Sequence, residues 1–282
     1  MKPKIIVVTG ASSGIGKATA LFLLKKGHIV YGAARSVGKM EALQAAGGHV
    51  IKMDITIDSD IQNVVDQVIQ EQKGIDVLIN NAGYGLYGAI EDIPVEEARK
   101  QFEVNLFGLA RITQLFLPYM RKAKSGRIIN ISSIGGKIYS PLGAWYYATK
   151  HALEGWSDSL RLDVKPFHID VVLIQPGVIQ TEFGDVMSDT LKQFSGNSAY
   201  KNMANAVVEA STESFHKKNG GSPVSLIATV IHKAVEARKP KIRYKAGKYA
   251  TLLPFLRKYL GDRMYDKMVL LQLNQIASKN RK

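Results

Sequence analysis

The chain has 282 residues, of which 46% are hydrophobic and 22% are charged. This composition predicts one large or two small globular domains and excludes a wholly disordered or fibrous chain. Because cysteine is absent, the chain has no disulfide framework, thiolate metal site or cysteine nucleophile. The apolar run 5–8 is too short for a secretory signal, and no apolar stretch reaches the length of a membrane span. We therefore expect a cytoplasmic protein.

The net charge of +14 is unevenly distributed along the chain. Residues 233–282 contain 14 Lys or Arg and three acidic residues, so they carry +11 and the preceding residues only +3. A basic tail therefore follows a nearly neutral body. No nucleic-acid-binding motif accompanies this charge, and we expect no nucleic-acid partner.

Short apolar runs alternate with segments of helical periodicity up to about residue 245, which is the pattern of repeated strand and helix units. Several runs are rich in Val and Ile without polar alternation, so they indicate strands buried on both faces of a parallel sheet. The predicted strands are 5–8, 29–33, 50–53, 77–79, 127–131, 169–174 and 242–244. The predicted helices are 14–26, 58–71, 95–122, 144–164 and one that follows Pro223 and ends near Ala237.

Residues 184–221 interrupt this alternation, since they mix Gly, Ser, Asn and Asp with scattered apolar residues. A connection of this length inside a compact domain is usually functional and often a lid. We expect one catalytic domain over residues 1–247, with 184–221 as its substrate loop. A basic, apolar extension follows over residues 248–282.

A glycine-rich turn follows the first predicted strand, and a predicted helix begins within it. Its residues are Thr9, Gly10, Ala11, Ser12, Ser13, Gly14, Ile15 and Gly16. Glycines here allow a tight turn and close approach to a pyrophosphate, which the amides of a helix N-terminus bind. A P-loop is excluded because Ala11 and Ala18 occupy positions where it needs Gly and Ser or Thr. The spacing is GxxxGxG rather than GxGxxG, so a merely structural turn remains the alternative to dinucleotide binding.

Tyr146 and Lys150 lie four residues apart in a predicted helix and therefore share one face. An ammonium group beside a phenol favours the phenolate and lowers its pKa from about 10, which suits acid-base catalysis. Tyr147 and His151 form a competing pair one residue later, although a mostly neutral histidine helps less. Read alone, the pattern of Tyr146 and Lys150 is more often a solvated helix face.

Other catalytic classes lack the residues they need. The six histidines show no metal-ligand spacing, and with no cysteine we expect no metal site. Ser133 does not lie in the G-x-S-x-G turn of a hydrolase nucleophile.

Taken together, the motifs resemble those of the short-chain dehydrogenase/reductase family, in the family order and over roughly residues 4–245. The matching segments are 9–16, Asn80 to Gly83, Asn105, 131–133, Tyr146 to Lys150, and Pro176-Gly177 followed by Thr181. The segment 81–85 and the basic apolar tail are most similar to the 17β-hydroxysteroid dehydrogenase-like and retinol dehydrogenase-like branch. The resemblance implies an α/β fold with a single doubly wound parallel sheet, the Rossmann fold, with helices on both faces. It also implies a homo-oligomer, either a dimer or a tetramer.

The resemblance also implies catalytic roles. Tyr146 exchanges a proton with the substrate oxygen, and Lys150 lowers the pKa of Tyr146 and binds the nicotinamide ribose. Ser133 hydrogen-bonds the substrate oxygen, and Asn105 holds a water linked to Lys150. A buried packing amide is the alternative for Asn105. The small-molecule substrate is then a carbonyl compound or an alcohol, and the hydride comes from a cofactor because no side chain supplies one.

NAD-selective proteins of this fold carry an acidic residue at the end of the second strand, whereas an Arg there accommodates the 2'-phosphate of NADP. Here Arg35 and Ser36 follow that strand and no acid is present, which favours NADP over an Arg that merely covers the surface. Asp54 lies where the family contacts adenine, or is a solvated loop carboxylate. The remaining cofactor residues implied by the resemblance are Gly10, Ser12, Ser13, Gly14, Ile15, Gly16, Asn81, Ala82, Gly83, Tyr146, Lys150, Pro176, Gly177, Val178 and Thr181.

Substrate contacts are expected from loops at the carboxyl ends of the strands. Besides Ser133, the candidates are Tyr84, Leu86, Tyr87, Ile138, Tyr139, Trp145, Val178, Ile179, Phe183, Met187 and Phe194. Most are apolar or aromatic, which favours a bulky lipophilic substrate resembling a steroid, a retinoid or a long-chain carbonyl compound. Each residue is equally compatible with a place in the core. A regulator that binds NADP(H) without turnover is the functional alternative.

The tail mixes Leu252, Phe255 and Leu260 with basic residues and predicts a short amphipathic helix broken near Pro254. Such a helix either packs on the body with its basic groups in water, which we favour, or makes weak contact with an anionic membrane surface.

Overall fold

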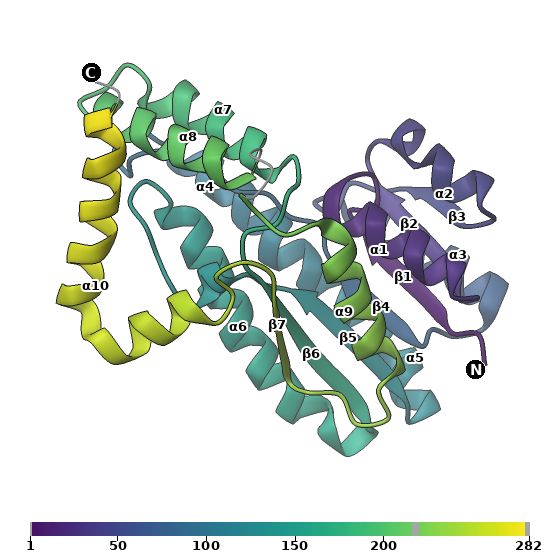
Figure 1. Cartoon of the computed structure of the whole chain (residues 1–282). Helices are drawn as coiled ribbons and strands as arrows, with labels where there is room; N and C mark the ends of the chain where they lie inside the picture. Colours follow the sequence, from purple (N-terminus) through teal and green to yellow (C-terminus); the bar gives the residue numbers. More distant parts are fainter. Residues whose placement is uncertain (1, 216–219, 280–282) are drawn as a thin grey trace.

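The computed structural model describes residues 2–215 and 220–279, and its centre is a parallel sheet (Figure 1). The strands are β1 (Ile5–Thr9), β2 (Ile29–Ala34), β3 (His49–Lys52), β4 (Val77–Asn80), β5 (Gly126–Ile131), β6 (Ile169–Pro176) and β7 (Arg243–Ala246). They form one seven-stranded sheet in the order β3-β2-β1-β4-β5-β6-β7, and every neighbouring pair is parallel. The predicted doubly wound parallel sheet is confirmed.

The strands are apolar on both sides because both faces of the sheet are covered. In β1, Ile6 and Val8 join the core on one face while Val7 joins the core on the other, and all three are fully buried. The strand order reverses between β1 and β4. In such sheets this switch point opens a crevice at the carboxyl ends of the strands, where ligands bind.

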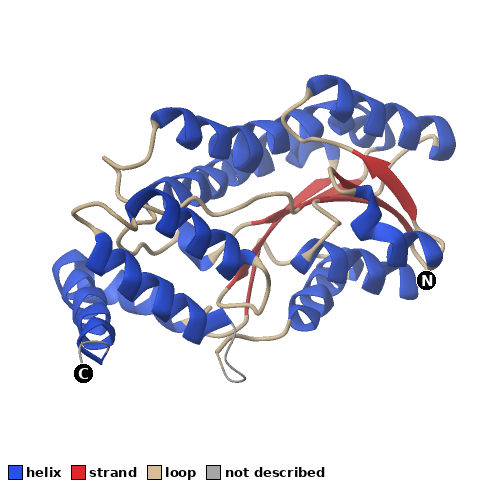
Figure 2. Cartoon of the chain, turned by 90° about the horizontal axis from the view of Figure 1, so that it is seen from above, coloured by secondary structure: helices blue, strands red, loops and turns tan. Residues whose placement is uncertain are grey.

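The helices lie on both faces of the sheet (Figure 2). They are α1 (Gly14–Lys25), α2 (Glu41–Ala45), α3 (Asp58–Gln72), α4 (Val95–Phe102), α5 (Leu109–Ala123), α6 (Ala144–Val164), α7 (Phe183–Ser195), α8 (Lys201–Phe215), α9 (Val224–Glu236) and α10 (Leu252–Lys279). Short 3-10 turns are η1 (Val37–Met40), η3 (Ile134–Gly136) and η4 (Lys165–Phe167). The helices α1 and α9 cover one face, and α3, α5 and α6 cover the other.

The predicted helix 95–122 contains a π-helical segment. Between α4 and α5 the backbone forms the π-helix η2 (Glu103–Gly108). Gly108 ends this segment against the loop after β3, where a Cβ would lie 2.1 Å from the carbonyl oxygen of Ile55. Local π-helical turns often occur at functional sites, and this one carries Asn105.

The long connection after β6 is largely helical, because its scattered apolar residues recur at helical spacing. Met187 and Leu191 on α7 pack with Ala204 and Val207 on α8 in a cluster separate from the two sheet cores. With α10, these helices form a group at one end of the sheet (Figure 1).

The tail is helical and packs on the body. The break in α10 is at Gly261, where φ is 72°, and not near Pro254 as expected. Pro254 instead lies in the first turn of the helix, where its missing N–H costs no hydrogen bond. Beyond the break, Tyr265 is 1% exposed and packs with Ile134 and Ile138. None of the helices within residues 2–215 and 220–279 has the length and hydrophobicity that crossing a bilayer requires.

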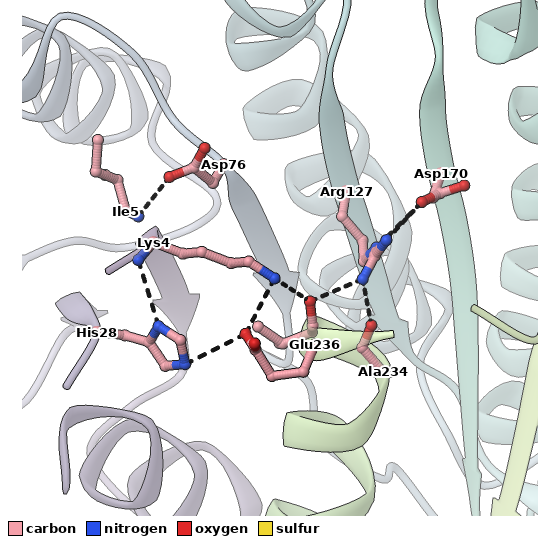
Figure 3. Close-up of polar contacts among 9 residues, drawn as sticks. Lys4, Ile5, His28, Asp76, Arg127, Asp170, Ala234 and Glu236 are labelled. Atoms are coloured by element: carbon pink, nitrogen blue, oxygen red, sulfur yellow. Dashed lines mark hydrogen bonds and ion pairs between the residues drawn. The ribbon is translucent and has the colours of Figure 1, made fainter. Parts of the chain in front are cut away.

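A polar network joins the elements at the other end of the sheet (Figure 3). The ammonium group of Lys4 lies 3.0 Å from the carboxylate of Glu236 at the end of α9, and His28 Nε2 lies 3.5 Å from the same oxygen. His28 Nδ1 accepts the backbone N–H of Lys4 at 3.3 Å, so the neutral ring carries its proton on Nε2. Arg127 donates to the carbonyl oxygens of residues 234 and 235 and to Asp170. These contacts attach α9 to the starts of β1, β2 and β5.

Candidate active site

A cavity of about 1050 Å³ lies at the carboxyl ends of the strands. Its walls come from the turn after β1, the loops after β2 to β6, and the helices α6, α7, α8 and α10. The cavity extends from Arg35 at one end to Leu273 and Ile276 of α10 at the other. The cavity therefore lies at the switch point that the strand order predicts.

The turn after β1 can be formed only with glycines at two positions. Gly10 has a φ of +67°, a left-handed conformation that favours glycine. A Cβ on Gly16 would lie 2.2 Å from the carbonyl oxygen of Gly10, so no side chain fits where α1 approaches the turn. Glycine at these positions lets the turn close tightly above the end of β1.

Asn81, just after β4, holds the turn in place. Its side-chain amide donates to the carbonyl oxygens of Thr9 at 3.0 Å and Gly10 at 3.2 Å. In return, the Thr9 hydroxyl accepts the backbone N–H groups of Asn81 and Ala82, both at 3.0 Å. These bonds hold the carboxyl ends of β1 and β4 together at the point where the strand order reverses.

The turn after β1 and the N-terminus of α1 fit the pyrophosphate of a dinucleotide. The Ser13 side chain makes no capping hydrogen bond at the N-terminus of α1, and Ser12, Ser13, Gly14 and Ile15 line the cavity there. The first amides of a helix lack partners within the helix and favour an anion. Across the cavity, Gly177 leaves no room for a side chain, because a Cβ would lie 2.0 Å from the carbonyl oxygen of Lys248. Backbone groups and small residues therefore form this part of the wall.

The end of the cavity beside β2 and β3 contains charged groups. Arg35, Ser36 and Asp54 all line it. Burial alone would raise the pKa of Asp54, but hydrogen bonds from Thr56 and the charge of Arg35 hold that pKa below its ordinary value. The Asp54 carboxylate accepts the backbone N–H of Thr56 at 3.0 Å and its hydroxyl at 2.8 Å. Asp54 is therefore ionised at neutral pH and shapes the loop after β3.

Tyr146 and Lys150 lie one turn apart on α6 and both face the cavity. From the sequence we expected Lys150 to lower the pKa of Tyr146. In the structure, burial raises this pKa above its ordinary value, and a hydrogen bond with Ser133 only partly offsets the rise. Burial also lowers the pKa of Lys150 to about 8, while the charge of Glu154 opposes this change. Tyr146 is therefore protonated at neutral pH, and Lys150 is mostly cationic.

The end of β5 and the turn directly after it fix the groups around this pair. Lys150 Nζ donates to the carbonyl oxygen of Ile131 at 2.9 Å, which ties α6 to the end of β5. The Ser133 hydroxyl accepts the N–H of Gly135 at 3.0 Å at the start of η3. The hydroxyls of Ser133 and Tyr146 consequently meet at the cavity wall.

Asn105 lies behind the wall and is 1% exposed. Its amide oxygen accepts the N–H of Tyr84 at 3.1 Å, and its amide nitrogen donates to the Tyr84 carbonyl oxygen at 3.0 Å and the Thr149 hydroxyl at 3.1 Å. One side chain thus joins the π-helical segment, the loop after β4 and the turn of α6 that carries Lys150. Asn105 positions the site without lining the cavity.

A buried carboxylate lies behind Lys150. Glu154, 3% exposed, accepts from Gln175 at 2.9 Å and Arg243 at 3.0 Å and lies 3.2 Å from Lys137. These partners come from β6, β7 and the loop after β5. Glu154 was not among the predicted site residues, because an acidic residue one helical turn after Lys150 reads as a solvated face in the sequence.

Comparison with known proteins agrees with this geometry. The sequence profile of the short chain dehydrogenase family matches residues 4–192. The chain belongs to the short-chain dehydrogenase family. This dehydrogenase is an oxidoreductase of the kind that acts on CH–OH groups with a nicotinamide cofactor.

Two curated relatives match almost the whole dehydrogenase. A 3-ketodihydrosphingosine reductase from Bacteroides thetaiotaomicron is 39% identical over 257 residues, covering 90% of this chain and 91% of the relative. An NADPH-dependent 3-dehydrocapnine reductase from Ornithobacterium rhinotracheale is 33% identical over 285 residues, covering 97% and 99%. A solved metagenomic short-chain oxidoreductase in complex with NADP is 36% identical with a TM-score of 0.58, covering 61% of this chain and 81% of that one.

The fold of the dehydrogenase brings most of the predicted site residues to one cavity. Those that line it are Gly10, Ser12, Ser13, Gly14, Ile15, Arg35, Ser36, Asp54, Asn81, Ala82, Gly83, Tyr84, Tyr87, Ser133, Ile138, Tyr139, Tyr146, Lys150, Pro176, Gly177, Val178, Ile179, Thr181, Phe183 and Met187. Gly16 and Asn105 lie behind the wall. Leu86 is 2% exposed in the interior, and neither Trp145 nor Phe194 lines the cavity.

In the dehydrogenase, α8 and α10 provide part of the wall whose residues the sequence did not single out, although α8 lies within the expected substrate loop 184–221. These residues are Leu253, Tyr265, Met268, Val269, Gln272, Leu273 and Ile276 from α10, and Val207, Ala210, Ser211, Ser214 and Phe215 from α8. A signal was present in the tail, since most of the α10 residues recur every three or four positions, as one face of a helix does.

Proposed function

We propose that this dehydrogenase is an NADPH-dependent reductase of a ketone on a long-chain, lipid-like molecule. One observation carries the proposal: a single cavity joins the glycine turn and Arg35, the Tyr146 and Ser133 hydroxyls, and an apolar end walled by α8 and α10. Cofactor, reacting carbonyl and chain would then lie in sequence along it.

The cofactor would be held by backbone amides of the turn after β1, by the wall at Pro176 to Val178 and by Lys150. NADPH, when bound, supplies the hydride that becomes bonded to the carbonyl carbon. Ser133 donates a hydrogen bond to the carbonyl oxygen, and Tyr146 delivers the proton that converts this oxygen to a hydroxyl. The cationic Lys150 stabilises the phenolate that Tyr146 then carries.

The protonation states support reduction as the favoured direction. Burial raises the pKa of Tyr146, so the hydroxyl holds its proton at neutral pH and can donate it. The Lys150 pKa of about 8 keeps a positive charge nearby at the same pH. Both groups begin in the state that ketone reduction requires.

The charge at the end of β2 supports NADPH. Arg35 and Ser36 line the cavity, and the strand ends without an acidic residue that would bind a ribose 2'-hydroxyl. The relative from Ornithobacterium rhinotracheale is named as NADPH-dependent. A 2'-phosphate beside Arg35 would gain a charge-assisted hydrogen bond.

The apolar end of the cavity supports a long-chain substrate. Leu253, Met268, Val269, Leu273 and Ile276 contribute to it from α10. The names of two relatives specify ketones of lipid-like molecules, 3-ketodihydrosphingosine and 3-dehydrocapnine. We propose the same substrate class here in preference to a steroid or a retinoid.

The test is NADPH oxidation by the full chain with 3-ketodihydrosphingosine, short 3-ketones, a steroid ketone and retinal. We expect kcat/KM to rise with chain length and to be highest for the long-chain ketone. Turnover of the steroid alone would overturn the substrate class. NADPH binding with no turnover of any of these compounds would instead favour the non-catalytic regulator.

A cavity variant sharpens this test. Leu273 lines the apolar end, whereas Leu271 is 51% exposed on the same helix and does not line it. We expect Leu273→Trp to lower kcat/KM for the long-chain ketone by at least roughly tenfold, because the larger side chain would occupy space that the chain of the ketone needs. The rate with a short ketone should remain near wild type, and the control Leu271→Trp should change neither rate.

A further inference from the structure

Exposed apolar side chains are concentrated on α10 and the turn before it. Among the described residues, 19 large hydrophobic side chains are exposed, and seven of them lie between positions 249 and 271. We call these seven the outer face of α10: Tyr249, Leu252, Phe255, Tyr259, Met264, Leu270 and Leu271. Single exposed apolar residues need no explanation, but a concentration of this kind marks an interaction site.

Before the break at Gly261, this outer face follows the helical repeat. Leu252, Phe255 and Tyr259 are 51%, 55% and 64% exposed and lie on one side of the first half of α10. The rings of Phe255 and Tyr259 are in contact, with centroids 4.5 Å apart. In both views the helix lies at the edge of the molecule (Figures 1 and 2).

Basic groups accompany the apolar ones. The ammonium groups of Lys248 and Lys258 each lie 5.2 Å from a ring centroid, Lys248 over Tyr249 and Lys258 over Tyr259. After the break, Lys267 lies between Met264 and Leu271 on one side of the helix. Aromatic rings and basic side chains on one helix are typical of segments at a lipid headgroup region.

The acidic groups of this region are already engaged by the protein. Asp262 pairs with Arg257, and Asp266 accepts a hydrogen bond from the Tyr139 hydroxyl at 2.8 Å. Among the residues that the structure describes, no carboxylate forms an ion pair with Arg263 or Lys267. The outer face of α10 therefore presents positive charge to its surroundings.

The opposite face of the same helix forms part of the cavity wall. Met268, Val269 and Leu273 line the cavity, while Met264 and Leu271 point away from it. One helix thus separates the apolar end of the cavity from the outer apolar face. Whatever surface covers α10 lies next to the place where a lipophilic molecule would be held.

We propose that the outer face of α10 docks the protein on an anionic lipid bilayer, with the apolar side chains in the headgroup region and the basic ones against lipid phosphates. A second copy of the chain is a poorer occupant. A symmetric dimer through this face would bring the same basic groups together on both subunits. A bilayer satisfies both the apolar and the basic side chains at once.

The experiment is flotation of the full-length protein with vesicles, without substrate. Vesicles of phosphatidylglycerol and phosphatidylcholine in equal parts should carry the protein, and vesicles of phosphatidylcholine alone should carry much less. High salt should release it, because exposed charges are screened. Protein that stays unbound to the anionic vesicles would overturn the proposal.

Two surface variants test the two components separately. Phe255→Gln with Tyr259→Gln removes exposed rings, and Arg263→Gln with Lys267→Gln removes charge; none of these residues lines the cavity. Each pair should lower partitioning onto anionic vesicles by roughly tenfold or more. Matched controls are Leu162→Gln, at 64% exposure on α6, and Lys52→Gln with Lys122→Gln, exposed on β3 and α5. Variants that float like wild type, or controls that lose binding equally, would contradict the assignment to α10.

The oligomeric state and the activity serve as separate readouts. The protein could form a dimer in solution that the double variant Phe255→Gln with Tyr259→Gln dissociates. This result would show that a second copy covers the outer face of α10, and it would overturn the proposal of bilayer docking. Both surface variants should reduce a short, water-soluble ketone at the wild-type rate. Because flotation needs no turnover, vesicle binding without ketone reduction would refute the proposed function and leave the docking surface intact.

Discussion

Lys150 and Glu154 lie one turn apart on α6, and the charge of Glu154 opposes the effect of burial on the pKa of Lys150. Burial lowers the pKa of Lys150 to about 8, and the carboxylate of Glu154 keeps it from falling further. Glu154 is in turn held by Gln175 and Arg243 from the neighbouring strands. The protonation of Lys150 thus depends on a network that reaches the far edge of the sheet.

Removing Glu154 should therefore alter the pH dependence of the reaction. Glu154→Gln deletes the charge that raises the Lys150 pKa, so Lys150 should lose its proton at lower pH. If activity needs cationic Lys150, the alkaline limb of the kcat/KM profile should move to lower pH. Because removing one partner of a buried ion pair typically costs roughly 3 to 5 kcal/mol, unfolding should be measured alongside.

A matched control separates the shift of the Lys150 pKa from the effect of removing an ion-pair partner of Arg243. Asp158 accepts from the same guanidinium at 2.6 Å and lies one turn further from Lys150. Asp158→Asn should destabilise the protein without moving the alkaline limb of the profile. Equal shifts in both variants would remove the specific role of Glu154.

Tyr146→Phe should abolish turnover while NADPH affinity stays within a few-fold of wild type. The change removes the proton donor, and a general acid contributes roughly 100-fold to 10,000-fold. Tyr147→Phe is the control, because the hydroxyl of Tyr147 lies 2.8 Å from that of Ser140 instead. Steady-state rates and fluorescence titration with NADPH measure the two effects. If Tyr147→Phe were inactive and Tyr146→Phe active, Tyr147 and not Tyr146 would be the proton donor.

Arg35→Ala should weaken the preference for NADPH over NADH. A charge-assisted hydrogen bond contributes about 1.5 to 3 kcal/mol, so the ratio of kcat/KM values should fall at least roughly tenfold. Adding Ala34→Asp at the end of β2 should lower the ratio further by opposing the 2'-phosphate. A ratio unchanged in Arg35→Ala would exclude Arg35 from the cofactor site.

His28 should make the protein less stable in acid. Burial lowers its pKa below the ordinary 6.5, although Glu236 opposes this. The unfolded chain therefore takes up a proton first, and the stability present above about pH 6.5 is lost as pH falls below it. Each proton taken up only on unfolding contributes a slope of at most about 1.4 kcal/mol per pH unit. Urea unfolding at a series of pH values should show a flatter decline in His28→Gln, and the exposed His151→Gln should behave like wild type.

The alternation of buried runs and amphipathic segments determined the parallel sheet and its layers from sequence alone. This succeeded because β-strands covered on both faces must be apolar throughout, as Ile6, Val7 and Val8 are. The motifs likewise predicted one site for the glycine turn, Ser133, Tyr146 and Lys150. These residues share a cavity because all lie at or near the carboxyl ends of strands in one sheet.

Only the tertiary structure decided the protonation of the site and the composition of its apolar wall. The pKa of Tyr146 depends on burial by helices distant in sequence, and spacing along α6 reveals nothing of that burial. The wall from α8 and α10 arises because Tyr265 and Leu273 pack against apolar residues of other elements, while Phe255 and Tyr259 on the same helix stay 55% and 64% exposed. A periodic pattern predicts that a helix has an apolar face, but the surface against which that face packs is set by contacts across the whole chain.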